Sequence, residues 1–240
     1  MFKVIKVKNY DEMSLAGFEE VKELVSNNPS CVLGLATGST PIGVYKLMID
    51  DHKSNGTSYK NVITFNLDEY CGLPKSHPES YYSFMHKNLF DGLDIDEKNI
   101  HIPEDGIDKE AKCVEYEDAM KSHVVDLQIL GIGSNGHIGF NEPGTPFSTK
   151  THVVKLKEST RQDNARFFDS IDEVPTHAIT MGIDTIMQAK KIIILASGEK
   201  KSEVINEMIN GEVSEELPAS ILQNHPNVVV IIDEEAASKL

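Results

Sequence analysis

The chain opens with a strand pattern that is followed by a helical one. Residues 3–8 alternate apolar and basic side chains, which predicts a strand with one exposed face. Asp11 is expected to cap the next helix, because apolar residues then recur every three or four positions as far as Asn27. These apolar positions are Leu15, Phe18, Val21, Leu24 and Val25.

Most later strands are predicted from apolar runs without alternation, which are typical of strands buried on both faces. These runs are 31–36, 62–67, 125–132, 192–196 and 228–232, and shorter strands are predicted over 99–102 and 153–156. Helices are predicted over 41–48, 80–89, 108–123, 200–210 and 234–240.

The regular alternation of strands and helices predicts a single α/β domain over residues 1–240. We expect a doubly wound, mostly parallel, Rossmann-like sheet with helices on both faces. In such sheets ligands bind beyond the carboxyl ends of the strands, and the chemically informative residues of this chain all lie at those ends.

Composition narrows the classes of partner. The 240 residues carry 23 Lys plus Arg against 38 Asp plus Glu, a net charge of -15, which disfavours binding to nucleic acid or to an anionic membrane. The three cysteines, Cys31, Cys71 and Cys113, form no C-x-x-C pair, and no run approaches 18 apolar residues. A cytoplasmic protein without export signal or membrane span is predicted.

A glycine loop follows the second predicted strand. Gly38, Ser39, Thr40 and Pro41 offer backbone N–H groups, two hydroxyls and a helix N-terminus, which together suit a phosphate or another anion. The alternative is an ordinary turn with Thr40 as the N-cap and Pro41 at the first helical position. The loop lacks the lysine pattern of an ATP-binding P-loop.

The segment 131–136 matches G-x-G-x-x-G, but its context argues against a dinucleotide site. Pro143 and Pro146 follow too closely for the long helix whose N-terminus would hold a pyrophosphate. The loop is better interpreted as a frame that exposes His137.

His137 has two candidate partners near it in the sequence. Glu142 can raise the basicity of the imidazole, and Asn135 can hydrogen-bond the same ring. A loop histidine bonded to local backbone is the alternative. Zinc is disfavoured because the H-x-x-x-x-E spacing differs from the helical H-E-x-x-H, and no cysteine is near. We predict no metal site.

Asp68 and Glu69 follow an apolar strand, and adjacent residues of an extended chain point to opposite sides, so at most one of them is expected to face a cleft. A carboxylate in a partly dry pocket can have a pKa high enough to abstract a carbon-bound proton. A helix cap or surface acid is the alternative. Arg161, Arg166 and the lysine pair 200–201 would alone be ordinary solvated cations.

Taken together, these segments resemble the glucosamine-6-phosphate deaminase (isomerase) family over nearly the whole chain. The motifs are LGLATGSTP (33–41), FNLDEY (65–70), LGIGSNGHIGFNEP (130–143), Thr160–Arg161 with NARFF (164–168), and TMGID (180–184). The G-H-I-x-F-N-E-P run distinguishes this family from the related 6-phosphogluconolactonases.

The resemblance implies conversion of glucosamine 6-phosphate and water to fructose 6-phosphate and ammonia, without a metal or an organic cofactor. It implies that Asp68 moves the proton from C2 to C1 of the opened sugar. It also implies that His137 opens the ring, with Glu142 and Asn135 orienting and tuning it. Some relatives carry Asp where this chain has Asn135.

The resemblance further implies a phosphate site made of Gly38, Ser39, Thr40, Arg166 and Lys201, and a lid over 161–184. Longer relatives are hexamers activated by N-acetylglucosamine 6-phosphate. Because this chain ends soon after Ile232, weak or absent allosteric control is expected. Monomer and homo-oligomer both remain open, as do a related sugar-phosphate lactonase or pentose-phosphate isomerase and a non-catalytic sugar-phosphate sensor.

Overall fold

The computed structural model describes residues 2–158, 161–162, 165, 168 and 170–240. Within them, one seven-stranded sheet has the order β1-β10-β9-β6-β2-β3-β5, and every neighbouring pair in it is parallel. Its strands are β1 (Lys3–Val7), β2 (Val32–Leu35), β3 (Ile63–Asn66), β5 (Ile100–His101), β6 (Leu127–Leu130), β9 (Ile192–Ala196) and β10 (Val228–Asp233). The predicted doubly wound parallel sheet is confirmed.

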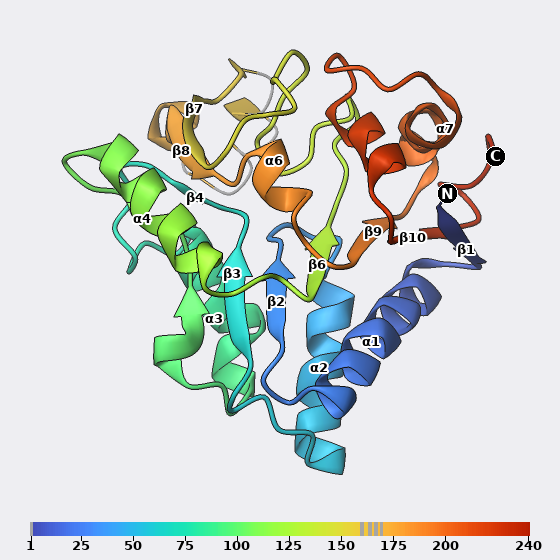
Figure 1. Ribbon diagram of the computed structural model, residues 1–240, viewed down its shortest axis with the longest axis horizontal. Coiled ribbons are helices and arrows are strands. Elements are labelled where there is room, and N and C mark those ends of the chain that lie inside the picture. The colour runs from blue at the N-terminus through green and yellow to red at the C-terminus, as the bar shows by residue number, and fades with distance from the viewer. Residues whose placement is uncertain (1, 159–160, 163–164, 166–167, 169) are drawn as a thin grey trace.

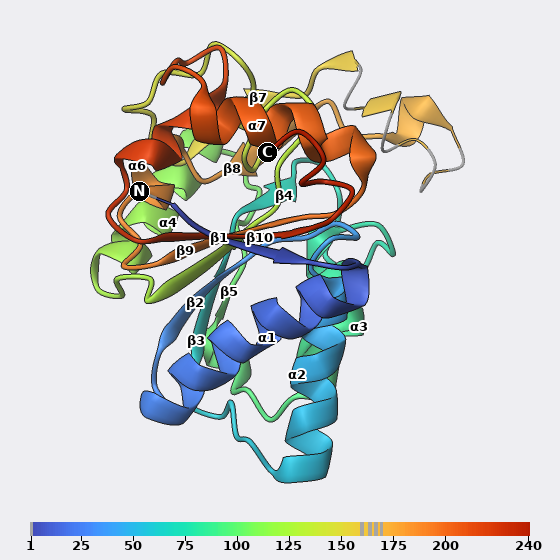
Figure 2. The same cartoon turned by 90° about the vertical axis from the view of Figure 1, so that its right-hand side faces the viewer.

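Helices cover both faces of this sheet (Figures 1 and 2). One face carries α1 (Tyr10–Asn27), α2 (Ile42–Asn55), α3 (Tyr81–Asn88), η1 (Phe90–Gly92) and η2 (Glu97–Asn99). The other is covered by α4 (Lys109–Lys121), α6 (Ile183–Ile186), α7 (Ser202–Asn210) and η6 (Pro218–Asn224). The short η4 (Ile171–Glu173) and η5 (Glu199–Lys201) lie in connections.

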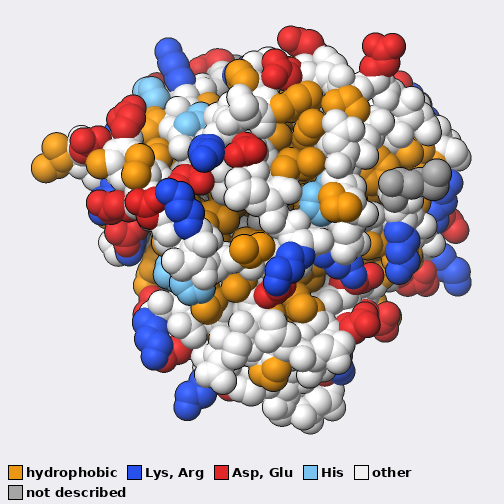
Figure 3. Space-filling model, in the orientation of Figure 1, with side chains coloured by type: hydrophobic (Ala, Val, Ile, Leu, Met, Phe, Trp, Pro, Cys, Tyr) orange, Lys and Arg blue, Asp and Glu red, His pale blue; other side chains and the backbone are white. Residues whose placement is uncertain are grey.

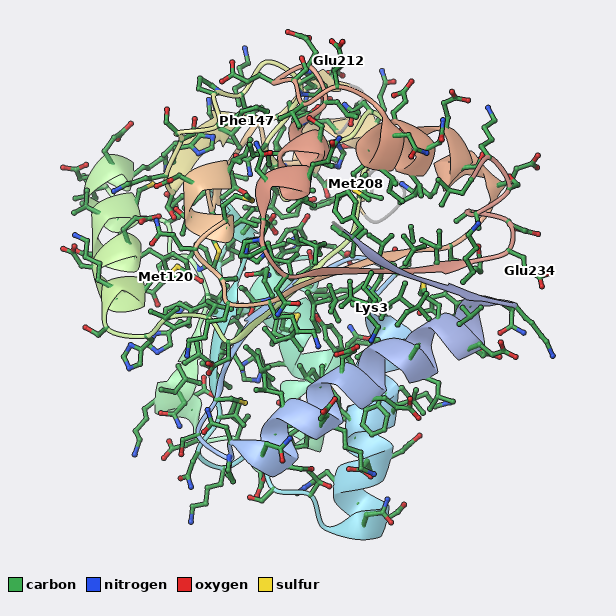
Figure 4. The ribbon with its side chains drawn as sticks, turned by 45° about the vertical axis from the view of Figure 1, so that its right-hand side comes forward. Lys3, Met120, Phe147, Met208, Glu212 and Glu234 are labelled. Atoms are coloured by element: carbon green, nitrogen blue, oxygen red, sulfur yellow. The ribbon has the colours of Figure 1, made fainter. Side chains whose placement is uncertain are left out.

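The two helical layers explain why the central strands are apolar without alternation. In β9, Ile192 and Ile194 belong to the core under α7, whereas Ile193 and Leu195 belong to the core under α1. Met208 projects from α7 toward the sheet (Figure 4). Because successive strand residues point to opposite faces, a strand between two helical layers needs an apolar residue at every position.

A second sheet lies at the carboxyl edge of the first and was not predicted. It contains β4 (Asp68–Tyr70), β8 (His177–Thr180) and β7 (His152–Lys155) in the antiparallel order β4-β8-β7. The apolar run 62–67 therefore does not end in a loop: after Leu67 the chain passes from the main sheet into this smaller one (Figure 1).

Two local predictions, and the helix cap offered as an alternative for the glycine loop, were wrong. Asn9, not Asp11, caps α1, because its side chain accepts a hydrogen bond from the Glu12 amide. Pro41 occupies the N-cap position of α2, so Thr40 does not cap that helix. Residues 234–239 form successive turns and no helix, because the amides of Ser238 and Leu240 bond to carbonyls three residues earlier and not four.

The predicted lid over 161–184 overlaps the second sheet. Its last part contains β8, which is the middle strand of that sheet, and the buried start of α6 at Ile183. Arg166 and Thr160 lie outside the described residues. Among the helices that the structure describes, none has the length and apolarity needed to cross a membrane.

Candidate active site

A cavity of about 320 Å³ opens beyond the carboxyl ends of β2, β3 and β6. Six of the predicted site residues line it together: Gly38, Ser39, Thr40, Asp68, His137 and Lys201. Parallel strands place their carboxyl ends at one edge, so loops that are distant in sequence converge there.

Asp68 is the first residue of β4 and lines the cavity with only 6% of its surface exposed. Burial, and secondarily the charge of Glu69, raises its pKa to about 8. A carboxylate with so high a pKa binds a proton far more strongly than an ordinary aspartate. Asp68 is therefore suited to abstracting a proton from carbon.

Glu69 has a different environment from Asp68. Its carboxylate accepts hydrogen bonds from the backbone amides of Tyr70, Tyr81 and Tyr82, at 2.8 to 2.9 Å. The last two amides belong to the first turn of α3, so Glu69 fixes the start of that helix. The expectation that only one of the two acids faces the cleft is confirmed, and that acid is Asp68.

His137, Asn135 and Glu142 form a hydrogen-bonded chain. The Asn135 amide nitrogen donates to Glu142 Oε2 at 2.7 Å, and Asn135 Oδ1 lies 2.7 Å from His137 Nδ1. Because a carboxylate only accepts, the Asn135 amide nitrogen faces Glu142 and its oxygen faces the imidazole. His137 Nδ1 therefore carries a proton, and in the neutral ring Nε2 is left as the proton acceptor.

Two further charged contacts are made within and beside the Asn135, His137 and Glu142 group. Glu142 Oε1 lies 3.9 Å from His137 Nδ1, and Lys157 Nζ lies 3.5 Å from Glu142 Oε2. A Cβ at Gly133 would lie 2.3 Å from the His137 ring, so only glycine allows the ring to occupy this position. The prediction that the 131–136 loop frames His137 is confirmed. The chain from 131 to 151 contains no helix, which agrees with the argument against a dinucleotide site.

The Gly38–Thr40 loop and Lys201 bring hydrogen-bond donors and a positive charge to the same cavity. Gly38 has a φ of 88° and begins the loop that leads into α2, and the Ser39 and Thr40 side chains line the cavity. Lys201 ends η5, and its ammonium donates to the Ile132 carbonyl at 2.7 Å while lining the same cavity. Backbone amides at a helix N-terminus beside a lysine suit an anion.

Arg161 is not among the residues that line this cavity. Its guanidinium donates to the carbonyls of Ile171 and Val174 and pairs with Glu158 at 3.0 Å, so it holds its own segment together.

Sequence reasoning missed two aromatic residues that line the cavity, Tyr81 and Phe140. Their rings are stacked, with centroids 6.2 Å apart and planes 9° apart. Phe140 stands in the motif around His137, whereas nothing in the sequence distinguishes Tyr81 from a core aromatic. Among the described residues, no group of three or more His, Cys, Asp or Glu side chains is placed to hold a metal ion.

The fold and the cavity define an α/β protein in which a buried aspartate and a histidine share one cavity with a glycine loop that suits an anion. A family model described as glucosamine-6-phosphate isomerases/6-phosphogluconolactonase matches residues 10–231. The chain belongs to this family.

Curated relatives cover nearly the full length. A glucosamine-6-phosphate deaminase of Halalkalibacterium halodurans is 51% identical over 240 residues, 99% of this chain and 98% of that protein. One from Thermoanaerobacter pseudethanolicus is 54% identical over 239 residues, 98% of this chain and 94% of that protein.

Solved structures agree with this assignment. The structure of a monomeric glucosamine-6-phosphate deaminase superimposes over 100% of both chains with a TM-score of 0.96 and 45% identity. A 6-phosphogluconolactonase from Trypanosoma brucei shares the fold, with a TM-score of 0.79 at 22% identity over 100% of this chain and 99% of that one.

Proposed function

We propose that the protein converts glucosamine 6-phosphate and water into fructose 6-phosphate and ammonia. One observation carries the proposal: Asp68 with its raised pKa, the imidazole of His137 and the Gly38–Thr40 loop line one cavity. An aldose-to-ketose shift needs these groups, because one must move a proton between adjacent carbons and the other must open the sugar ring.

The reaction uses the two groups in sequence. His137, with Nδ1–H held by Asn135, takes the proton of the C1 hydroxyl at Nε2 and returns it to the ring oxygen as the bond between C1 and that oxygen breaks. Asp68 then takes the proton from C2, which gives an enolamine, and returns a proton to C1. The resulting imine at C2 adds water and releases ammonia, which leaves the ketone of fructose 6-phosphate. Atoms balance with one water consumed.

We propose that the phosphate group of the substrate binds between the Gly38–Thr40 loop and Lys201. The Gly38–Thr40 loop supplies amides and hydroxyls, and Lys201 supplies a cation. Arg166 is proposed as a second cation, and the 161–184 segment as a lid. Phosphate binding far from the reacting carbons helps to position them against Asp68.

Three further properties of the protein concern its cofactors, its location in the cell and its oligomeric state. We propose that the reaction needs no metal or organic cofactor, and that the enzyme acts in the cytoplasm. Monomer and homo-oligomer both stay open for this protein. The solved relative with a TM-score of 0.96 is a monomeric enzyme.

The test is a direct assay of ammonia and fructose 6-phosphate formed from glucosamine 6-phosphate. Wild-type protein should form both in equal amounts, and Asp68→Asn should lose about 100-fold or more in kcat, the usual contribution of a general base. His137→Ala should be severely impaired as well. Asp126→Asn, which removes a carboxylate at the opposite end of β6, is the matched control and should stay active.

Three results would contradict the proposal. Full activity of Asp68→Asn would exclude the assigned base. Hydrolysis of 6-phosphogluconolactone without ammonia release would favour the lactonase, and binding of sugar phosphate without turnover would favour the sensor.

A further inference from the structure

The end of β8 lies between the strand that carries Asp68 and the loop that carries His137. Thr180 is the residue opposite Asp68 in the β4–β8 register. The next residue, Met181, donates its amide to the Leu67 carbonyl at 2.7 Å, directly before Asp68. The base is thus attached to β8 by backbone hydrogen bonds.

The histidine loop is attached to the same end of β8. Thr180 is completely buried, and its hydroxyl oxygen accepts a hydrogen bond from the Phe140 amide at 3.1 Å. Asn141 is also completely buried, and its amide nitrogen donates to the Ile138 carbonyl at 2.9 Å and to the Met181 carbonyl at 2.8 Å. These two side chains therefore connect the loop after His137 to the residues opposite Asp68.

The contact between loop and base is close. A Cβ at Gly139 would lie 3.0 Å from the Thr180 hydroxyl oxygen and 3.6 Å from Asp68 Oδ2, and Gly139 has a φ of 57°. The loop backbone thus approaches Asp68 with little room to move toward it. Thr180 and Asn141 are not among the residues that line the cavity, so they stand behind the reacting groups.

We propose that Thr180 and Asn141 are positioning residues that fix the separation between Asp68 and His137. This inference rests on the proposed function, in which both groups must act on one bound sugar. A displacement of about 1 Å in such a pair can cost about 100-fold in rate, so the rigid connection through β8 matters for catalysis. The hydroxyl of Thr180 and the amide of Asn141 provide that connection.

The test compares two buried threonines that are five residues apart. Thr180→Val keeps the shape of the side chain but removes the acceptor of the Phe140 amide, and kcat should fall by about 10-fold or more with a smaller change in KM. Thr180→Ser keeps the hydroxyl and should retain most of the activity. Thr185→Val is the matched control, because the hydroxyl of Thr185 donates to Glu117 and does not contact the loop.

A second readout separates positioning from loss of folded protein. Glucosamine 6-phosphate with deuterium at C2 should show a larger isotope effect on kcat with Thr180→Val than with wild type, because proton abstraction becomes slower relative to the other steps. A smaller folded fraction lowers kcat but leaves the isotope effect unchanged. Asn141→Asp, which has the same shape but lacks the donor, should reproduce the behaviour of Thr180→Val.

The outcomes are distinguishable. If wild-type protein releases no ammonia, the proposed function fails. If wild type is active, and Thr180→Val and Asn141→Asp both keep the wild-type kcat and isotope effect, the positioning role is wrong while the proposed function stands. Equal losses with Thr180→Val and Thr185→Val, with the isotope effect unchanged, would also overturn the positioning role.

Discussion

Asn135 decides which nitrogen of His137 is available to a substrate. Its amide donates to Glu142 and its oxygen accepts from His137 Nδ1, so the imidazole is held through a neutral group. A carboxylate in the same place would hold the ring in the same orientation but would also attract its positive form. The charge of residue 135 can therefore change the proton affinity of His137 without changing the orientation of its ring.

Asn135→Asp tests whether the charge at position 135 controls the proton affinity of His137. The introduced carboxylate should raise the pKa of His137, because it stabilises the imidazolium and removes the neutral spacer. The pH at which His137 titrates, followed by NMR of the ring, should increase, and the pH dependence of kcat/KM should move in the same direction. Asn210→Asp adds the same charge at an exposed position of α7 and is the control. An unchanged His137 titration would show that Asn135 does not control this proton.

At the scale of elements, the turn after β9 is held by the last residue of β10. Asp233 accepts hydrogen bonds from the Ser197 hydroxyl at 2.5 Å, from the Gly198 amide at 3.1 Å and from the Ala236 amide at 2.8 Å. Gly198 has a φ of 92° and precedes η5, which ends at the cavity lysine, Lys201. The buried carboxylate therefore orders the turn from which that lysine reaches the cavity.

Asp233→Asn should chiefly weaken substrate binding. An amide has one acceptor oxygen in place of two, so at least one of these donors loses its partner and the turn becomes less ordered. Loss of about 1.4 kcal/mol of binding corresponds to a roughly 10-fold higher KM, and kcat should change less. Asp126→Asn is the control, because Asp126 also bonds a strand amide but lies at the opposite edge of the sheet. A larger effect on kcat than on KM would contradict this assignment.

The strands also show which parts of the fold can be predicted from the sequence. The strands β9 and β10 were predictable, because a strand between two helical layers must be apolar at each position. The antiparallel pairing of β4 with β8 was not, because it joins residues more than 100 positions apart, such as Asp68 and Thr180. Local pattern carries no information on such a pairing.

Within the site, too, some residues could be predicted from the sequence and others could not. Asp68 and His137 were predictable because a carboxylate and an imidazole at strand ends are chemically unusual there. Tyr81, Thr180 and Asn141 were not, because their roles depend only on what the fold places beside them. Three-dimensional contacts are needed to identify residues of this kind.

For the whole molecule, the negative net charge opposes the binding of a phosphorylated substrate. The net charge is -15, and acidic and basic side chains are interspersed on the face shown in Figure 3. An anionic substrate is thus repelled at long range, and binding must come from the local amides and cations of the cavity. Within this acidic molecule Asp68, the proposed catalytic base, is held in a site that disfavours its ionised form, and this lowers the stability of the folded protein.

That cost has a defined dependence on pH. The folded pKa of Asp68 is about 8 against 3.8 for the free side chain, so the folded state holds a proton that the unfolded state has lost between these values. The contribution of Asp68 to the free energy of unfolding therefore falls as pH rises through this window, by about 1.4 kcal/mol for each pH unit, and is constant above it. Asparagine does not titrate and avoids this loss.

Asp68→Asn should consequently become more stable relative to wild type as pH rises from 5 to 8, as measured by urea unfolding of both proteins across that range. Asp51→Asn provides a control of opposite sign. Burial raises the pKa of Asp51, but its bonds with Lys22, Thr57 and Asn55 outweigh burial and leave that pKa below its usual value. The stability that Asp51 provides is therefore lost only at lower pH, and this variant should be less stable than wild type by a constant amount from pH 5 to 8. A constant difference for Asp68→Asn as well would show that the base has an ordinary pKa, and that the buried cavity does not tune it.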